Sequence, residues 1–187
     1  CLCALGGADG GIIVAGTCSV VYSYRNGKGP SFGGHGFPCG DNGSGAWLGL
    51  LGFQSVLLAL DELGPGTRLL AAFENHLGTS ALGLVDSMAG ARPREYGVLA
   101  PLVLECADSG DAVAAAIVQD GADYLTQLAR KLLASGAPVL CMLGGLAPRM
   151  LPLMAADIRE QMAQPRAEAD VGAVQLALSA GRVETQA

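Results

Sequence analysis

The sequence contains few charged residues. Only 15% of its 187 residues are charged, whereas 51% are hydrophobic. A disordered chain shows the opposite balance, low hydrophobicity with high charge, so the composition predicts a folded protein with one sizeable core. The 28 glycines show no collagen period and are too numerous for an ordinary helical bundle. They indicate tight turns and places where the backbone closely approaches another group.

Features of several protein classes are also missing. The net charge is −6 and no basic stripe occurs, so nucleic acid is not an expected partner. The longest apolar run, residues 46–60, is shorter than the ~20 residues of a bilayer span and contains Gln54 and Ser55. We therefore expect no membrane partner. No charged start precedes an apolar stretch and a cleavage site, so we expect no signal peptide.

The six cysteines are scattered and form no CxxC pair. That spacing does not support a zinc or iron–sulfur site, so we assign no metal ligand. Reduced thiols in a cytoplasmic protein are the simplest interpretation.

Short β-branched runs next to glycine predict strands, and longer apolar stretches with helical periodicity predict helices. We expect strands at residues 11–15, 20–24 and 138–143, and helices at 46–63, 67–77, 80–88, 93–107, 108–134, from 148 onward and at 171–180. Asn26-Gly27 favours a tight hairpin turn. Asp108 or Ser109 is expected to cap the longest helix. Strands that run into glycines and then helices predict an α/β fold whose ligands lie beyond the carboxyl ends of the strands.

The first segment at such a strand end is Ala15-Gly16-Thr17-Cys18-Ser19. Glycine lets the backbone approach a phosphate, and Thr17 and Ser19 offer hydroxyl and N–H groups to an anion. A simple hairpin bend with two exposed hydroxyls would explain the same residues.

The second segment is GGHGFPCGDNGSGAWLG, residues 33–49, inside a glycine-rich stretch that must be either a functional loop or disordered. Asp41 is a carboxylate in this loop, where it could accept two sugar hydroxyls. It could equally cap the helix that follows.

The third segment is Leu143-Gly144-Gly145-Leu146-Ala147, a strand end with two glycines before a helix. The glycines would give an adenosine room against the backbone. An ordinary strand-to-helix turn is the alternative.

In this order and spacing, the three segments resemble the N-acetylglucosamine and glucosamine kinases of the BadF/BadG/BcrA/BcrD ATPase group, within the actin, hexokinase and heat-shock ATPase superfamily. The resemblance runs from GGADGGIIVAGTCS through GGHGFPCGDNGSGAWLG to LGGLAPRM and ADVGAVQLA. It implies a single domain over residues 1–187, the α/β C-terminal lobe of that ribonuclease H-like fold. It also implies that the N-terminal lobe, with the first phosphate turn and the catalytic aspartate, is absent. We therefore assign no catalytic residue.

The resemblance also implies roles by position. Gly16, Thr17 and Ser19 align with the second phosphate-binding turn, and Gly144 and Gly145 align with the adenosine site.

Gly34, His35, Gly36 and Asp41 align with the sugar-binding loop. Three residues depart from the family's usual pattern. Cys18 stands where glycine is usual, His35 where an aromatic residue is usual, and Asn42 where an acidic residue is usual.

The implied activity is phosphorylation of an amino sugar, with ATP and Mg²⁺ as cofactors, and we expect the present chain alone to be inactive. Two alternatives remain. The chain could be a non-catalytic module that binds a ligand or partner, or an ATPase activator of a 2-hydroxyacyl-CoA dehydratase-type reductase. The sequence leaves the oligomeric state open, and a homodimer is one of the possibilities.

Overall fold

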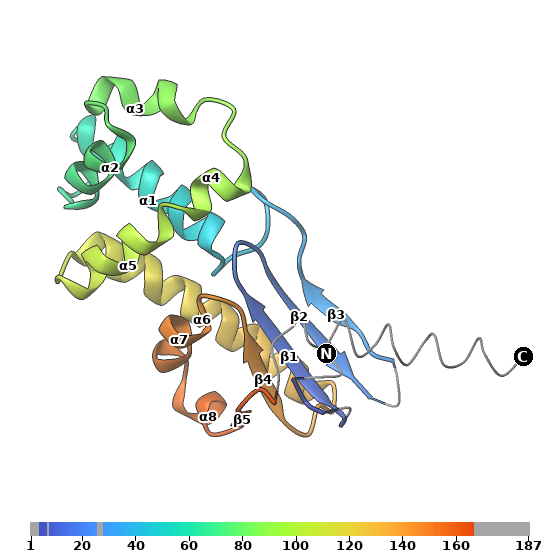
Figure 1. The fold of residues 1–187 in the computed structure, drawn as a ribbon. Coiled ribbons are helices and arrows are strands. Elements are labelled where there is room, and N and C mark those ends of the chain that lie inside the picture. Colours follow the sequence, from blue (N-terminus) through green and yellow to red (C-terminus); the bar gives the residue numbers. More distant parts are fainter. Residues whose placement is uncertain (1–3, 7, 26–27, 167–187) are drawn as a thin grey trace, which may run out of the picture.

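The computed structural model describes residues 4–6, 8–25 and 28–166. Its centre is a five-stranded sheet in the order β3-β2-β1-β4-β5 (Figure 1). The strands are β1 (Gly10–Ala15), β2 (Ser19–Tyr24), β3 (Ser31–Gly33), β4 (Leu140–Leu143) and β5 (Met162–Ala163). The three strands predicted from sequence are confirmed. β3 and β5, of three and two residues, were not predicted because such short strands leave no periodic pattern.

The sheet combines antiparallel and parallel pairs. β1 and β2 form an antiparallel hairpin in which Ala15 lies opposite Ser19. β4 runs parallel to β1, with Leu143 opposite Val14. A parallel pair requires a crossover connection, and the helices between β3 and β4 supply it. The carboxyl ends of β1 and β4 therefore meet at one edge of the sheet.

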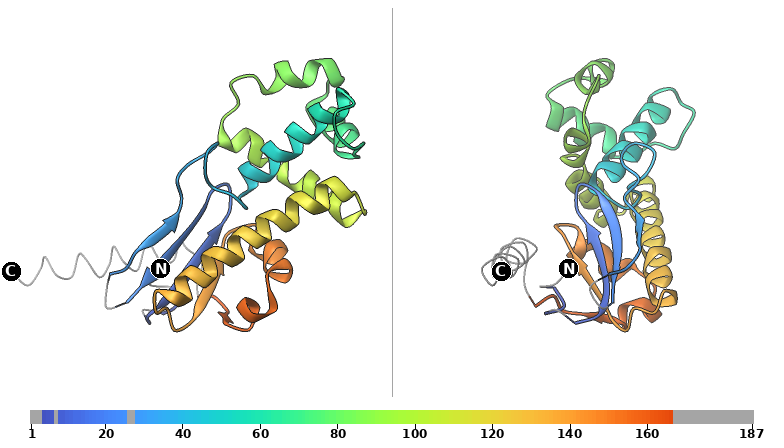
Figure 2. Two further views of the ribbon diagram at one scale, coloured as in Figure 1. Left: turned by 180° about the vertical axis from the view of Figure 1, so that it is seen from behind. Right: turned by 90° about the vertical axis from the view of Figure 1, so that its right-hand side faces the viewer.

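Eight α-helices are described. They are α1 (Gly45–Leu60), α2 (Leu69–Leu77), α3 (Ala81–Met88), α4 (Pro93–Gly97), α5 (Ala100–Asp108), α6 (Ala112–Ala134), α7 (Ala147–Met150) and α8 (Ala156–Arg159). The long helix α6 lies along one face of the sheet, where it contacts β1, β2 and β4 (Figure 2). In the part of the chain that the structure describes, no helix is long and apolar enough to cross a membrane.

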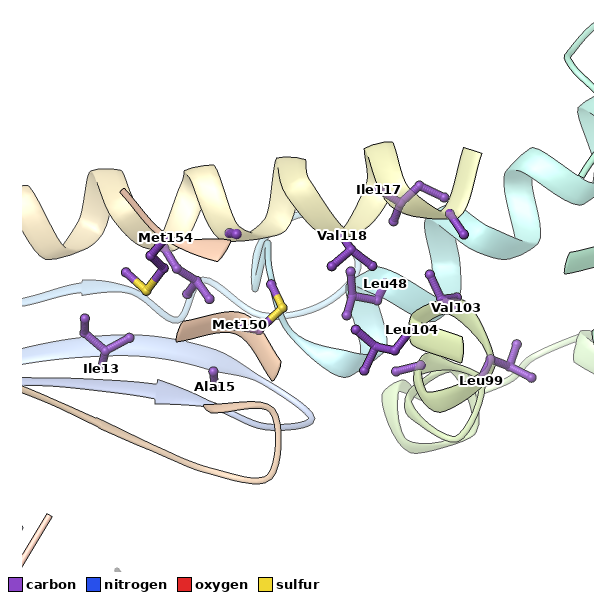
Figure 3. Packing of buried hydrophobic residues seen from close by; sticks show 14 of the residues in the cluster. Ile13, Ala15, Leu48, Leu99, Val103, Leu104, Ile117, Val118, Met150 and Met154 are labelled. Carbon is purple, nitrogen blue, oxygen red and sulfur yellow. The ribbon is translucent and has the colours of Figure 1, made fainter. Parts of the chain in front are cut away.

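The main core lies between α6, α1, α5 and the sheet (Figure 3). Ile13 and Ala15 of β1 belong to this core, whereas Ile12 belongs to a smaller cluster that contains Cys141 and Leu143. Successive strand side chains point to opposite faces, so β1 and β4 are buried on both. That double burial explains why their sequences are continuous apolar runs.

Two helix predictions need correction. The segment predicted as one helix over residues 93–107 forms two helices, α4 and α5. The cap of α6 is Asp111, whose side chain accepts a 2.8 Å hydrogen bond from the Ala114 amide, so neither Asp108 nor Ser109 is the cap. The helix predicted at residues 171–180 lies outside the described residues.

Arg25 and Lys28 exchange backbone hydrogen bonds of 2.8 and 3.0 Å, as expected for residues that flank a tight hairpin turn.

Candidate functional site

The first and third sequence segments lie side by side at the carboxyl ends of β1 and β4. The Leu146 amide donates a 3.1 Å hydrogen bond to the Ala15 carbonyl. Gly144 has φ +104°, and a Cβ added there would lie 2.3 Å from the Ala15 carbonyl oxygen. Only glycine allows this approach, so Gly144 holds the turn after β4 against the end of β1.

The second segment is tied to the turn between β1 and β2, residues 16–18. The Gly45 and Ala46 amides donate hydrogen bonds of 2.7 and 3.4 Å to the carbonyls of Gly16 and Thr17. These amides belong to the first turn of α1, where N–H groups have no partner inside the helix. The carbonyls of the hairpin turn therefore accept hydrogen bonds from amides at the start of α1. As a result, the three segments lie next to one another on one surface.

Asp41 is buried, with 7% of its surface exposed, and its backbone has φ +59°. Its Oδ1 accepts a 3.3 Å hydrogen bond from the Gly36 amide, which closes a short loop together with the 2.6 Å bond from the Gly40 amide to the Gly36 carbonyl. The cap of α1 is Ser44, whose Oγ accepts a 3.2 Å bond from the Trp47 amide. Asp41 is thus not the helix cap, and that alternative for its role is wrong.

Three glycines, one in each segment, face open space. A Cβ added at Gly16, Gly36 or Gly145 would meet no protein atom within 4 Å. Gly36 has φ +86° and needs glycine for its backbone conformation. Gly16 and Gly145 have neither a positive φ nor a close neighbour, so the fold itself gives no reason for glycine there.

The other predicted site residues differ in exposure. Thr17, His35 and Gly34 are exposed on this surface. Ser19 is fully buried, and its Oγ donates a 2.8 Å hydrogen bond to the Asn42 carbonyl. The Ser19 hydroxyl therefore links the hairpin to the loop that carries Asp41.

Sequence reasoning missed Tyr96 and Gly97 at the end of α4. A Cβ added at Gly97 would lie 3.5 Å from Cγ2 of Thr17, and the Tyr96 ring lies 5.2 Å from the Phe37 ring. Gly97 lies inside the segment predicted as one helix over residues 93–107, where a glycine resembles an ordinary interruption. Only the tertiary contact with Thr17 shows that Gly97 lies beside the turn between β1 and β2.

A cavity of about 370 Å³ opens between α5 and α7, with α6 forming its back wall. Its lining is mostly apolar, from Leu104, Ala107, Val118 and Pro148, with a 2.5 Å ion pair between Arg149 and Asp108 on it. That size lies within the usual range of small-molecule pockets. A second cavity of about 330 Å³ lies on the other side of α7, against β4 and β5.

The profile of the BadF/BadG/BcrA/BcrD ATPase family matches residues 2–177 of the chain. The chain belongs to this family. Residues 4–166, apart from the undescribed positions, hold no group of three His, Cys, Asp or Glu side chains that could bind a metal ion.

Known proteins that are similar in sequence or in structure support this assignment. The glucosamine kinase GspK of Vibrio cholerae is 33% identical over 177 residues, which cover 95% of this chain and 60% of GspK. A crystal structure from Chromobacterium violaceum, assigned as an N-acetylglucosamine kinase, superposes with a TM-score of 0.87 at 30% identity over 94% of this chain and 61% of that one. A Porphyromonas gingivalis protein at 19% identity and TM-score 0.68 shares the fold. The chain thus spans about 60% of the relatives that it matches, and it has the α/β fold of these actin-like ATPases.

Proposed function

We propose that this chain carries the second phosphate-binding turn, the adenosine site and the sugar loop of an ATP-dependent amino-sugar kinase. The observation that carries the proposal is the meeting of three separate glycine-rich segments on one surface at the carboxyl ends of β1 and β4. In α/β folds this edge of the sheet is where ligands bind. The glucosamine kinase relative makes an amino sugar the first substrate class to test.

The nucleotide would lie along the first and third segments. Its phosphates would lie at Gly16 and Thr17, where no side chain fills the space above Gly16 and the Thr17 side chain is exposed. Its ribose would pass Gly144 and Gly145. Its base would enter the cavity of about 330 Å³ between α7 and the strands β4 and β5, because Gly144 lines that cavity.

The sugar would lie at the loop of residues 34–41. Oδ1 of Asp41 already accepts the Gly36 amide, so the other carboxylate oxygen is left to accept sugar hydroxyls. His35 and Gly34 are exposed beside it and would contribute further contacts. Because Asp41 is buried and its loop is closed by hydrogen bonds, the carboxylate would be fixed before the sugar arrives.

The reaction would transfer the terminal phosphoryl group of ATP to a sugar hydroxyl, with ADP as leaving group and release of the hydroxyl proton. Mg²⁺ would arrive with the nucleotide and neutralise charge on its phosphates. The residues of this chain would bind and orient both substrates, since phosphoryl transfer depends mainly on positioning. No residue in the chain is assigned as the base that receives the proton. Residues 1–187 would form one domain, which functions with the part of the kinase that corresponds to the unmatched portion of the relatives.

A fusion experiment tests this proposal. The chain is joined to the portion of Vibrio cholerae GspK that it does not cover, and ADP release is measured with glucosamine and with N-acetylglucosamine. We expect sugar-dependent ADP release from the fusion and none from the chain alone. ATP hydrolysis that is independent of sugar would favour the reductase-activator alternative. Binding of both ligands by the chain with an inactive, folded fusion would favour the non-catalytic binding module.

A further inference from the structure

Four aromatic rings connect the sugar loop to the core. The Phe37 ring lies 5.2 Å from Tyr96, Tyr96 lies 6.3 Å from Phe53, and Phe53 lies 6.5 Å from Phe73, all between ring centroids. Phe53 and Phe73 are buried in the main core, with 6% and 0% of their surface exposed. The Tyr96 ring therefore connects the loop that carries Phe37 to the hydrophobic core. Loops are generally more mobile than the core elements they join.

Phe37 lies inside the closed loop that carries Asp41. The bond from the Gly36 amide to Asp41 and the bond from the Gly40 amide to Gly36 both enclose it. A shift of the Phe37 ring would therefore shift the backbone that holds the Asp41 carboxylate. The contact with Tyr96 restricts such a shift.

The backbone at Tyr96 is itself fixed on two sides. A Cβ added at Gly49 of α1 would lie 1.9 Å from the Tyr96 carbonyl oxygen, so α4 rests directly on α1. The next residue, Gly97, lies against Thr17 and against Gly45 at the start of α1. The dipeptide Tyr96-Gly97 thus touches the sugar loop through a side chain and the phosphate turn through its backbone.

We infer that Tyr96 is a positioning residue that sets the sugar loop at a fixed distance from the phosphate turn. The inference rests on the proposed function, since it assigns Tyr96 to the alignment of the two substrates. Tyr96 acts through Phe37 and touches neither substrate. Loss of its ring leaves the loop free to move and weakens sugar binding, while the phosphate turn keeps its bonds to α1.

The test compares Tyr96→Leu with Tyr96→Phe, and uses Phe73→Leu as a control that removes a ring remote from Phe37. Amide hydrogen exchange is measured without ligand, and dissociation constants are measured for N-acetylglucosamine, glucosamine and Mg·ADP. In Tyr96→Leu we expect exchange of the Gly36 and Gly40 amides to accelerate. The sugar dissociation constant should rise about 5-fold, within the range of about 2- to 13-fold that the energy of one aromatic pair gives. The Mg·ADP dissociation constant should change less than about 2-fold.

Tyr96→Phe keeps the ring, so this variant should retain the slow amide exchange and the sugar affinity of the wild type. Phe73→Leu should lower the melting temperature without changing the sugar dissociation constant. Unchanged exchange at Gly36 and Gly40 in Tyr96→Leu would overturn the inference, as would an equal loss of sugar and nucleotide affinity. A folded fusion with the GspK portion that shows no sugar-dependent ADP release overturns the proposed function instead, and the exchange comparison, which needs no ligand, still decides the role of Tyr96 in holding the loop.

Discussion

The Ser19 hydroxyl donates a 2.8 Å hydrogen bond to the Asn42 carbonyl, and Ser19 is fully buried. The two residues are 23 positions apart, and the bond joins the start of β2 to the residue after Asp41. This contact gives Ser19 a role that the sequence alone did not predict. Its hydroxyl anchors the loop that carries Asp41, so the exposed Thr17 is the better candidate for a phosphate contact from a side chain in this turn.

Ser19→Ala should lower the free energy of unfolding by about 1–2 kcal/mol, because the partly buried Asn42 carbonyl loses its donor. Ser31→Ala, at an exposed serine on β3, is the matched control and should stay within about 0.5 kcal/mol. Urea unfolding measures both. If Ser19→Ala reduces Mg·ADP affinity while stability is unchanged, the hydroxyl contacts phosphate and the anchoring role is wrong.

Gly144 and Gly145 offer a matched pair of substitutions. Gly144→Ala should cost at least about 2 kcal/mol of stability, because the residue has φ +104° and the new Cβ would lie 2.3 Å from the Ala15 carbonyl oxygen. Gly145→Ala meets no protein atom and should change stability by less than about 0.5 kcal/mol. If nucleotide lies at Gly145, this second variant should still weaken Mg·ADP binding several-fold. Unaltered Mg·ADP binding by a folded Gly145→Ala protein would remove Gly145 from the site.

Asp111 should make stability depend on pH. Burial raises the pKa of the Asp111 carboxyl, but hydrogen bonds from the Ala114 and Arg68 amides and the Thr67 hydroxyl outweigh it and hold the pKa below the ordinary 3.8. A carboxyl with a depressed pKa in the folded state stabilises the fold fully above pH 3.8, and this contribution disappears as the pH falls through the folded-state value.

Asp111→Ala should therefore cost about 1–2 kcal/mol at pH 7, as expected for the loss of a helix cap. The difference from wild type should shrink progressively below pH 3.8. Asp120→Ala, an exposed position on the same helix, is the control. Unfolding curves at pH 7 and at pH 3 check the prediction, and a difference that is the same at both would contradict it.

Cys18 is exposed in the turn between β1 and β2, so its side chain is not a core packing group. If the thiol crowds a phosphate, Cys18→Gly should tighten Mg·ADP binding, with a stability loss of about 0.5–1 kcal/mol from added backbone freedom. Cys18→Ser keeps the size and should leave the affinity unchanged. Titration calorimetry measures the Mg·ADP affinity of the wild type and of both variants. Weaker Mg·ADP binding by Cys18→Gly would show that the thiol does not crowd a phosphate.

Much of the fold followed from local patterns. The β-branched run of β1 is a strong signal because nearly every residue of the strand is buried. The apolar run of α1 also predicts a helix correctly, but this helix buries only one face and leaves Gln54 and Leu58 exposed. The break between α4 and α5 lies between Gly97 and Pro101, and Pro101 stands in the first turn of α5. A proline inside a helical pattern ends or kinks the helix before it, so the sequence did carry a local signal for this break.

The site was predictable to the level of segments but not of atoms. Glycine-rich strand ends indicated where ligands approach, and the structure brings those ends together. The sequence did not distinguish Asp41 from Ser44 as the cap of α1, since both are good capping residues before the same helix. It also could not assign the direction of the Ser19 hydroxyl, which depends on the path of the loop after Gly33.

The most direct test of the proposed site is a calorimetric titration of the wild-type chain and Asp41→Asn with glucosamine, N-acetylglucosamine and Mg·ADP. Asparagine tolerates the φ of +59° at this position and can still accept the Gly36 amide, so the loop should keep its shape. We predict a 10- to 100-fold loss of sugar affinity, about the value of hydrogen bonds to a charged group, with Mg·ADP affinity changed less than about 2-fold. Full sugar affinity in Asp41→Asn, or an equal loss of both ligands, would contradict the account.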